Sequence, residues 1–92
     1  MPIKSCTIDG KNIKTIDDVY DQLALQLEFP NHFGRNLDAL YDVLTTDIPG
    51  PLKIVWHHTR ASRAVLGDQY NLIKAVLKDA AAERKDIRVV FK

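Results

Sequence analysis

The spacing of apolar residues changes several times along this 92-residue chain, and each change predicts a different element. Between residues 19 and 27 apolar side chains recur every three or four positions, which predicts a helix with one buried stripe. Thr15 and Asp18 resemble a capping box at the beginning of this helix, and Pro30 ends it. A similar stripe over residues 68–84 predicts a second, longer helix.

Three short apolar runs have the length and composition of β-strands: residues 3–8, 52–56 and 86–91. An Asp9-Gly10 turn follows the first run, and the breaker Pro49-Gly50-Pro51 precedes the second. Residues 57–66 fit neither spacing well and allow a short helix. Because strands alternate with helices, the pattern predicts an α/β fold with a small parallel sheet and right-handed crossovers.

Length and composition predict one compact domain over residues 1–92, since 46% of the residues are hydrophobic. No apolar stretch approaches the roughly 20 residues that a transmembrane helix needs, and the N-terminus lacks the apolar run of a secretory signal. We therefore expect a cytoplasmic protein. Cys6 is the only cysteine, so it cannot form an internal disulfide, and we expect it to be a small buried residue.

Charge is distributed unevenly although the net charge is only +1. Residues 28–47 carry a net charge of −3, and residues 48–92 carry +5. This asymmetry suggests a charged partner without identifying it.

The acidic part of the chain contains a short amphipathic helix, predicted over residues 37–45. Asn36 is a good N-cap, and three leucines form the apolar side: Leu37, Leu40 and Leu44. Asp38 and Asp42 are four residues apart, so they project from one polar face. Like charges at this spacing destabilise an isolated helix by roughly 0.2–0.5 kcal/mol. No basic residue within the helix lies one turn from either, so the pair suggests an external partner.

The Asp38/Asp42 pair allows four interpretations: a catalytic acid–base pair, a metal site, a protein-binding surface or a solvated helix face. Tyr41 between them on the exposed side, with His32 and Phe33 just before the helix, favours a protein interface, where aromatic residues often anchor. A metal site needs more converging ligands, and catalysis needs a cleft with a nucleophile or an electrophilic stabiliser. The chain has no phosphate loop, nucleophile elbow or zinc motif, so we expect no enzyme activity, metal or cofactor.

Basic side chains in the second half raise the further possibility of RNA binding: Arg60, Arg63, Lys74, Lys78, Arg84 and Lys85. No recognised nucleic-acid module accompanies them, so a solvated basic surface is the favoured interpretation. His57 and His58 follow a strand and point to opposite faces, which makes them poor metal co-ligands. We expect Trp56 and Tyr70 to lie in the core or at its edge.

The segment from Phe29 to Thr45 resembles the barstar family, whose members are intracellular inhibitors of barnase-type ribonucleases. The specific part is Gly-x-Asn-Leu-Asp-Ala-Leu-aromatic-Asp at residues 34–42. The resemblance extends over essentially the whole chain and includes Ile8-Asp9-Gly10, Trp56 and Asp86-Ile87. It implies a barstar-like three-stranded parallel sheet packed against helices, and an inhibitor that is not an enzyme and needs no cofactor.

In that family the acidic helix and the preceding loop block the ribonuclease active site. The resemblance implies that Asp42 occupies the phosphate-binding site and that Asp38 pairs with basic and imidazole groups. His32 takes the place of an aromatic residue that packs on the catalytic histidine, and Tyr41 takes the place of an interface tryptophan. The remaining implied contacts are Gly34, Asn36, Leu37, Ala39, Thr45 and, on the later helix, Asp79, which replaces a glutamate that pairs with an enzyme arginine.

The resemblance thus implies that a monomer binds a barnase-type ribonuclease, with no direct contact to nucleic acid or a membrane. The alternative is a barstar-like module for a different basic protein. Arg35 adds a positive charge beside the helix, and the chain is not strongly acidic overall. We therefore expect weaker long-range steering than for a strongly acidic inhibitor, and a divergent ribonuclease as the target.

Overall fold

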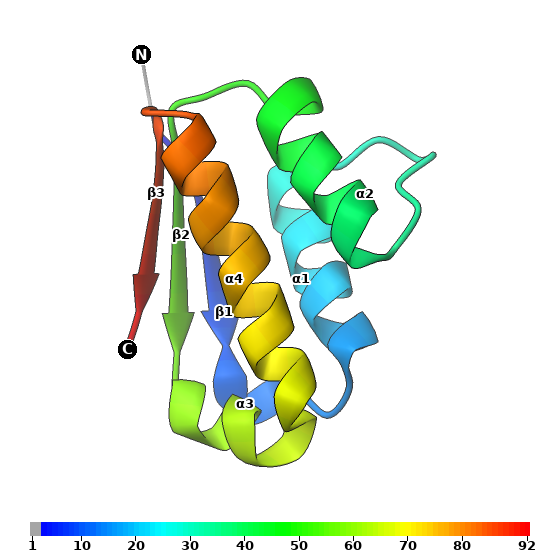
Figure 1. Cartoon of the computed structure of the whole chain (residues 1–92), viewed down its shortest axis with the longest axis vertical. Helices are drawn as coiled ribbons and strands as arrows, with labels where there is room; N and C mark the ends of the chain where they lie inside the picture. Colours follow the sequence, from blue (N-terminus) through cyan, green and yellow to red (C-terminus); the bar gives the residue numbers. More distant parts are fainter. Residues whose placement is uncertain (1–2) are drawn as a thin grey trace.

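A three-stranded parallel sheet forms one layer of the computed structural model, which describes residues 3–92 (Figure 1). Its strands lie in the order β1, β2, β3 and have these bounds: β1 Lys4–Asp9, β2 Leu52–His57 and β3 Ile87–Phe91. The helices between them are α1 Ile16–Leu27, α2 Leu37–Asp42, α3 Thr59–Leu66 and α4 Asp68–Glu83. The predicted α/β fold with a three-stranded parallel sheet is confirmed.

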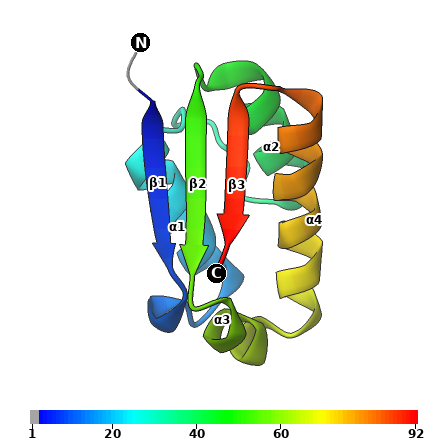
Figure 2. The same cartoon turned by 90° about the vertical axis from the view of Figure 1, so that its left-hand side faces the viewer.

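Helices α1, α2 and α4 lie behind one face of the sheet, and the other face is open (Figure 2). Because only one face of the sheet is covered, buried and more exposed side chains alternate along β2. Ile54 and Trp56 are buried, while Lys53 is exposed. Parallel sheets are usually covered on both faces and read as continuous apolar runs. Here one covered face is enough to place a single hydrophobic cluster between the sheet and the helices.

Most local signals in the sequence correspond to the observed boundaries. The Asp18 carboxylate accepts hydrogen bonds from the backbone N–H groups of Lys14 (2.8 Å) and Thr15 (3.1 Å), which begins α1 and lowers the pKa of Asp18. Helix α1 ends at Leu27, where Glu28 adopts a left-handed conformation with φ 56°. The ambiguous residues 57–66 contain α3.

Trp56 is fully buried in the hydrophobic core, and the sequence predicted it in the core or at its edge. Its indole Nε1 donates to Ser62 Oγ at 2.9 Å, and Ser62 Oγ donates to the carbonyl oxygen of Gly10 at 3.2 Å. Tyr70 packs against the indole edge to face, with ring centroids 5.3 Å apart. One hydroxyl therefore satisfies two buried polar groups and joins α3 to both β2 and the turn after β1.

Replacing Ser62 with alanine should lower the free energy of unfolding by about 1–3 kcal/mol, because the indole N–H and the Gly10 carbonyl would both lose their partner inside the core. Urea unfolding followed by tryptophan fluorescence measures this loss. Ser5→Ala on the exposed face of β1 is the control and should change stability by less than about 0.5 kcal/mol. Equal effects for the two variants would contradict the role assigned to the Ser62 hydroxyl.

Candidate functional site

The acidic helix begins at a side-chain cap. Asn36 Oδ1 accepts from the backbone N–H of Ala39 at 2.8 Å, and Asn36 Nδ2 donates to the carbonyl oxygen of Gly34 at 3.2 Å. Both ends of the Asn36 amide are thus used inside the protein, as the N-cap prediction required. Asn36 is one of the implied contact residues, and its side chain holds the backbone of Gly34 and Ala39 in place.

The helical segment is longer than predicted and changes type. After α2 it continues as a π-helical turn, η2 Val43–Asp47, closed by a hydrogen bond from Ile48 N to Val43 O at 3.1 Å. Val43 is buried together with Leu40 and Leu44, so the apolar side is wider than the three leucines that the sequence indicated. Val43 follows Leu40 by three residues, so the two side chains lie on the same side of the helix.

Asp38 and Asp42 are both exposed on the outer side of this segment. Among residues 3–92 neither carboxylate has a hydrogen-bond or ion-pair partner. Tyr41 between them is only half-exposed, and it packs against the hydrophobic core. The sequence placed Tyr41 on the exposed side of the helix, and the structure leaves it partly exposed while it packs against the core.

The hydroxyl of Thr45 is already engaged. Thr45 Oγ1 donates back to the carbonyl oxygens of Tyr41 (2.8 Å) and Asp42 (3.4 Å), so it offers lone pairs to a partner. His32 is exposed in the loop before α2, and its Nε2 lies 3.8 Å from Asp47 Oδ2 at the end of η2. This contact becomes an ion pair when His32 is protonated. The loop before α2 and the end of η2 therefore lie close together.

Arg35 does not direct its charge at the acidic face. Its Nη2 donates to Asp21 Oδ1 at 2.8 Å, to Asp17 Oδ1 at 3.4 Å and to the Asp17 carbonyl oxygen at 3.2 Å, all on α1. Asp21 holds the pKa of Arg35 above its usual value. The expectation that Arg35 weakens the acidic field beside the helix was incomplete, because two carboxylates compensate its charge.

Arg84 corrects a second expectation. The sequence placed it on a solvated basic surface, but its side chain is only 18% exposed. Its Nη1 donates to the carbonyl oxygens of Leu44 (2.8 Å) and Ile48 (2.6 Å), and its Nε and Nη2 bind the Asp86 carboxylate at 3.0 and 2.7 Å. Helix ends leave carbonyl groups without partners, and Arg84 satisfies them at the end of η2.

Asp79 is exposed on α4, which packs against α2. Leu72 of α4 borders a shallow groove of about 560 Å³ that is also lined by Leu37 and Asp38 of α2. Asp79 follows Leu72 by seven residues, or about two turns, so both lie on one face of α4. This geometry puts Asp79 on the side of α4 that borders α2.

Three further features of the described residues bear on function: the grouping of metal-ligating side chains, the reactivity of the cysteine and the apolar length of the helices. Within residues 3–92 no three His, Cys, Asp or Glu side chains are grouped to hold a metal ion. Burial raises the pKa of Cys6 to about 12, which removes thiolate reactivity at neutral pH. No helix in the described part of the chain is long and apolar enough to cross a membrane.

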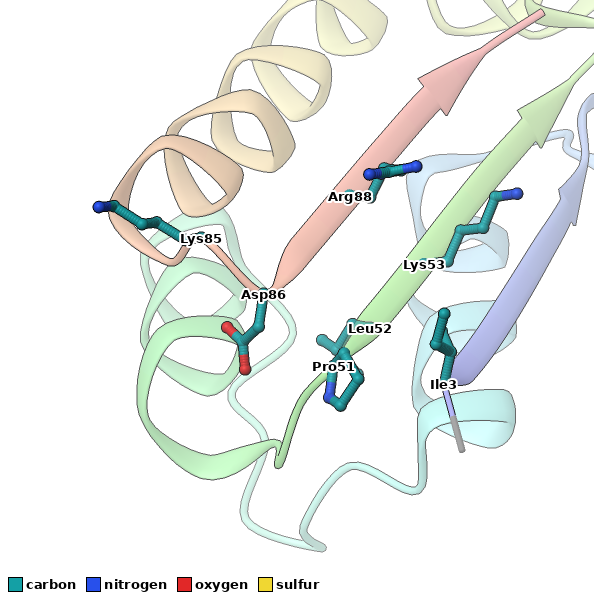
Figure 3. Close-up of a pocket in the computed structure, with 7 residues that line it drawn as sticks. All are labelled: Ile3, Pro51, Leu52, Lys53, Lys85, Asp86 and Arg88. Atoms are coloured by element: carbon teal, nitrogen blue, oxygen red, sulfur yellow. The ribbon is translucent and has the colours of Figure 1, made fainter. Parts of the chain in front are cut away.

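A basic hollow of about 250 Å³ lies on the open face of the sheet (Figure 3). It is lined by these residues: Ile3, Pro51, Leu52, Lys53, Lys85, Asp86 and Arg88. Lys53 and Arg88 are register partners on β2 and β3, and Figure 3 shows them on the same side of the sheet. None of the described residues that line the hollow is aromatic, so they offer no surface on which bases could stack. It is separate from the acidic helix, which packs on the covered face.

Two comparisons identify the family. Residues 3–92 match the protein family described as "Barstar (barnase inhibitor)". The chain is also 36% identical over 84 residues to the "Putative ribonuclease inhibitor YrdF" of Bacillus subtilis (strain 168), covering 91% of this chain and 92% of that protein. The fold, with its acidic helix on the covered face of a three-stranded parallel sheet, agrees with these matches. The chain belongs to the barstar family.

Proposed function

We propose that this protein inhibits a barnase-type ribonuclease by inserting α2 and the preceding loop into the basic active site of the enzyme. One observation carries the proposal. Asp38 and Asp42 are exposed side by side on a helix, and neither has a hydrogen-bond or ion-pair partner among residues 3–92. The match to a family described as barnase inhibitors supports the same function.

The chemistry of the target explains why carboxylates suit this role. A ribonuclease must bind phosphate, so its active site concentrates arginine, lysine and histidine side chains. Two carboxylates on a helix with a fixed backbone present the same kind of charge as two phosphate groups. Complementary fields speed the encounter, and close charge pairs slow dissociation. Inhibition is then stoichiometric, and the protein itself performs no reaction.

The proposed interface has a centre and a rim. Asp42 enters the phosphate-binding site, and Asp38 pairs with neighbouring basic and imidazole groups. Tyr41 adds apolar contact area between them, since a half-buried ring loses little conformational freedom on binding. His32, Thr45 and Asp79 form the rim, and the backbone at Gly34, Leu37 and Ala39 approaches the enzyme.

The proposed setting is the cytoplasm of the cell that makes the ribonuclease or receives it. There a monomer of the inhibitor would protect cellular RNA, which is the role of an immunity protein. The name of the Bacillus subtilis relative, which describes a ribonuclease inhibitor, supports the inhibition on which this setting depends.

Titration of a barnase-type ribonuclease with the purified protein tests the proposal. RNA cleavage should fall linearly with added protein and reach its minimum near one inhibitor per enzyme. The ribonuclease encoded beside this protein is the preferred enzyme, and heat-denatured protein is the control. Unchanged cleavage at a clear molar excess would refute the proposal, and capture of a basic protein without nuclease activity would favour the alternative binding module.

A further inference from the structure

Arg35 occupies an unusual backbone conformation in the loop between α1 and α2. Its φ is 52°, in the left-handed region that side-chain-bearing residues rarely adopt. Such conformations persist where surrounding contacts hold them. The contacts here are three hydrogen bonds from the guanidinium to Asp17 and Asp21 on α1. The guanidinium carbon also lies 5.9 Å from the centre of the Tyr20 ring.

Arg35 lies in the sequence between two other residues whose contacts hold the loop in place. On one side, Phe33 packs edge to face on Phe29 (5.0 Å) and Tyr20 (5.6 Å). On the other side, Asn36 caps α2 through Ala39 N. Fixing Arg35 therefore fixes the path of the backbone from the aromatic anchor to the first turn of the acidic helix.

We propose that Arg35 is a positioning residue: by binding Asp17 and Asp21 it holds the loop and the beginning of α2 in the conformation that a partner recognises. The inference rests on the proposed function, since it assigns Arg35 a part in that interaction. A loop already ordered in the free protein loses less conformational entropy on binding, which strengthens the complex. Arg35 would achieve this while its own charge is turned toward α1.

Two variants distinguish a role of Arg35 through its charge from a role in positioning the loop. If Arg35 acted only through its charge, Arg35→Asn would strengthen binding to a basic partner, and Asp21→Ala would weaken it. Positioning predicts that both variants weaken binding, because each breaks the same contact. Asparagine is chosen because it tolerates a positive φ, so the backbone itself is not strained by the substitution.

Hydrogen exchange in the free protein tests the first half of the proposal without any partner. The Phe33 amide is bonded to Pro30 O at 3.0 Å and the Ala39 amide to Asn36 Oδ1 at 2.8 Å. Both amides should exchange about tenfold faster in Arg35→Asn and in Asp21→Ala, while the amides of β2 keep their rates. Arg63→Asn, which removes an exposed arginine from α3, is the matched control.

Affinity for the ribonuclease tests the second half. At high salt, where the charge effect is screened, Arg35→Asn and Asp21→Ala should each weaken binding about three- to tenfold, and the double variant hardly more than either. Arg35→Lys should fall between Arg35→Asn and the original protein, because lysine keeps the positive charge but lacks the rigid planar guanidinium.

Three results would decide against the proposal: unchanged loop exchange, affinity equal to or tighter than that of the original protein, or fully additive losses in the double variant. If the original protein binds no ribonuclease, the proposed function fails, and the exchange rates alone then decide whether Arg35 orders the loop.

Discussion

Asp42→Ala should weaken binding to a cognate ribonuclease by about 2–5 kcal/mol, which raises Kd roughly thirtyfold to several thousandfold. The range draws in part on barnase with barstar, so it is not independent of this family. The loss arises because the basic groups of the enzyme would remain buried in the complex without their counter-charge. Asp42 lies past the first turn of α2, where the helix dipole helps it little, so its charge is available for a partner.

Two further variants isolate the Asp42 charge in the same binding measurement. Asp42→Asn keeps the shape of the side chain and should lose most of the same affinity. Asp68→Ala removes an equal charge from the first turn of α4 and should leave affinity within about threefold. The rate of dissociation should rise for Asp42→Ala, while the rate of association changes less. A loss below about 0.5 kcal/mol for Asp42→Ala would end its assignment to the centre of the interface.

Leu40→Ala should lower the free energy of unfolding by about 2–5 kcal/mol. Leu40 is 0% exposed and lies on the inner side of α2, so truncation leaves a cavity between the helix and the core. Urea unfolding measures the loss. Leu25→Ala is the matched control, because Leu25 is 81% exposed on α1 and its truncation removes no core contact.

The Leu25→Ala change should stay within about 0.5 kcal/mol of the original protein. A similar cost for the two leucines would mean that α2 is not anchored through Leu40. Neither Leu40 nor Leu25 belongs to the proposed contact residues, so these two variants report on stability and not on direct contact with the partner.

Elements with a strong local signal could be predicted from the sequence. The stripe through α1, the cap at Asn36 and the apolar runs of the strands each act over a few residues, so spacing and residue type suffice. The boundary errors are small: the first strand begins at Lys4, and α4 ends at Glu83. Helix α3 stayed ambiguous because its eight residues bury only Ser62 and Leu66, which is too weak a stripe to recognise.

The candidate site was predictable only where its chemistry is local. Asp38 and Asp42 are four residues apart, so their shared face follows from helix geometry. The supports of the helix are not local: Arg35 contacts α1 residues 14 and 18 positions earlier, and Arg84 contacts the end of η2 from 36 and 40 positions later. No spacing rule connects such pairs, and a polar side chain at either position looks solvated in the sequence.

The distance along the chain between Arg84 and the carbonyl groups it satisfies has a consequence for biosynthesis. A ribosome makes α2 and η2 before it makes the guanidinium that binds the Leu44 carbonyl 40 residues earlier. A nascent chain that stops after β2 therefore carries both aspartates on a segment whose carbonyl end is not fastened. The carbonyl end of the acidic segment can therefore be fastened only once Arg84, directly after α4, has been translated.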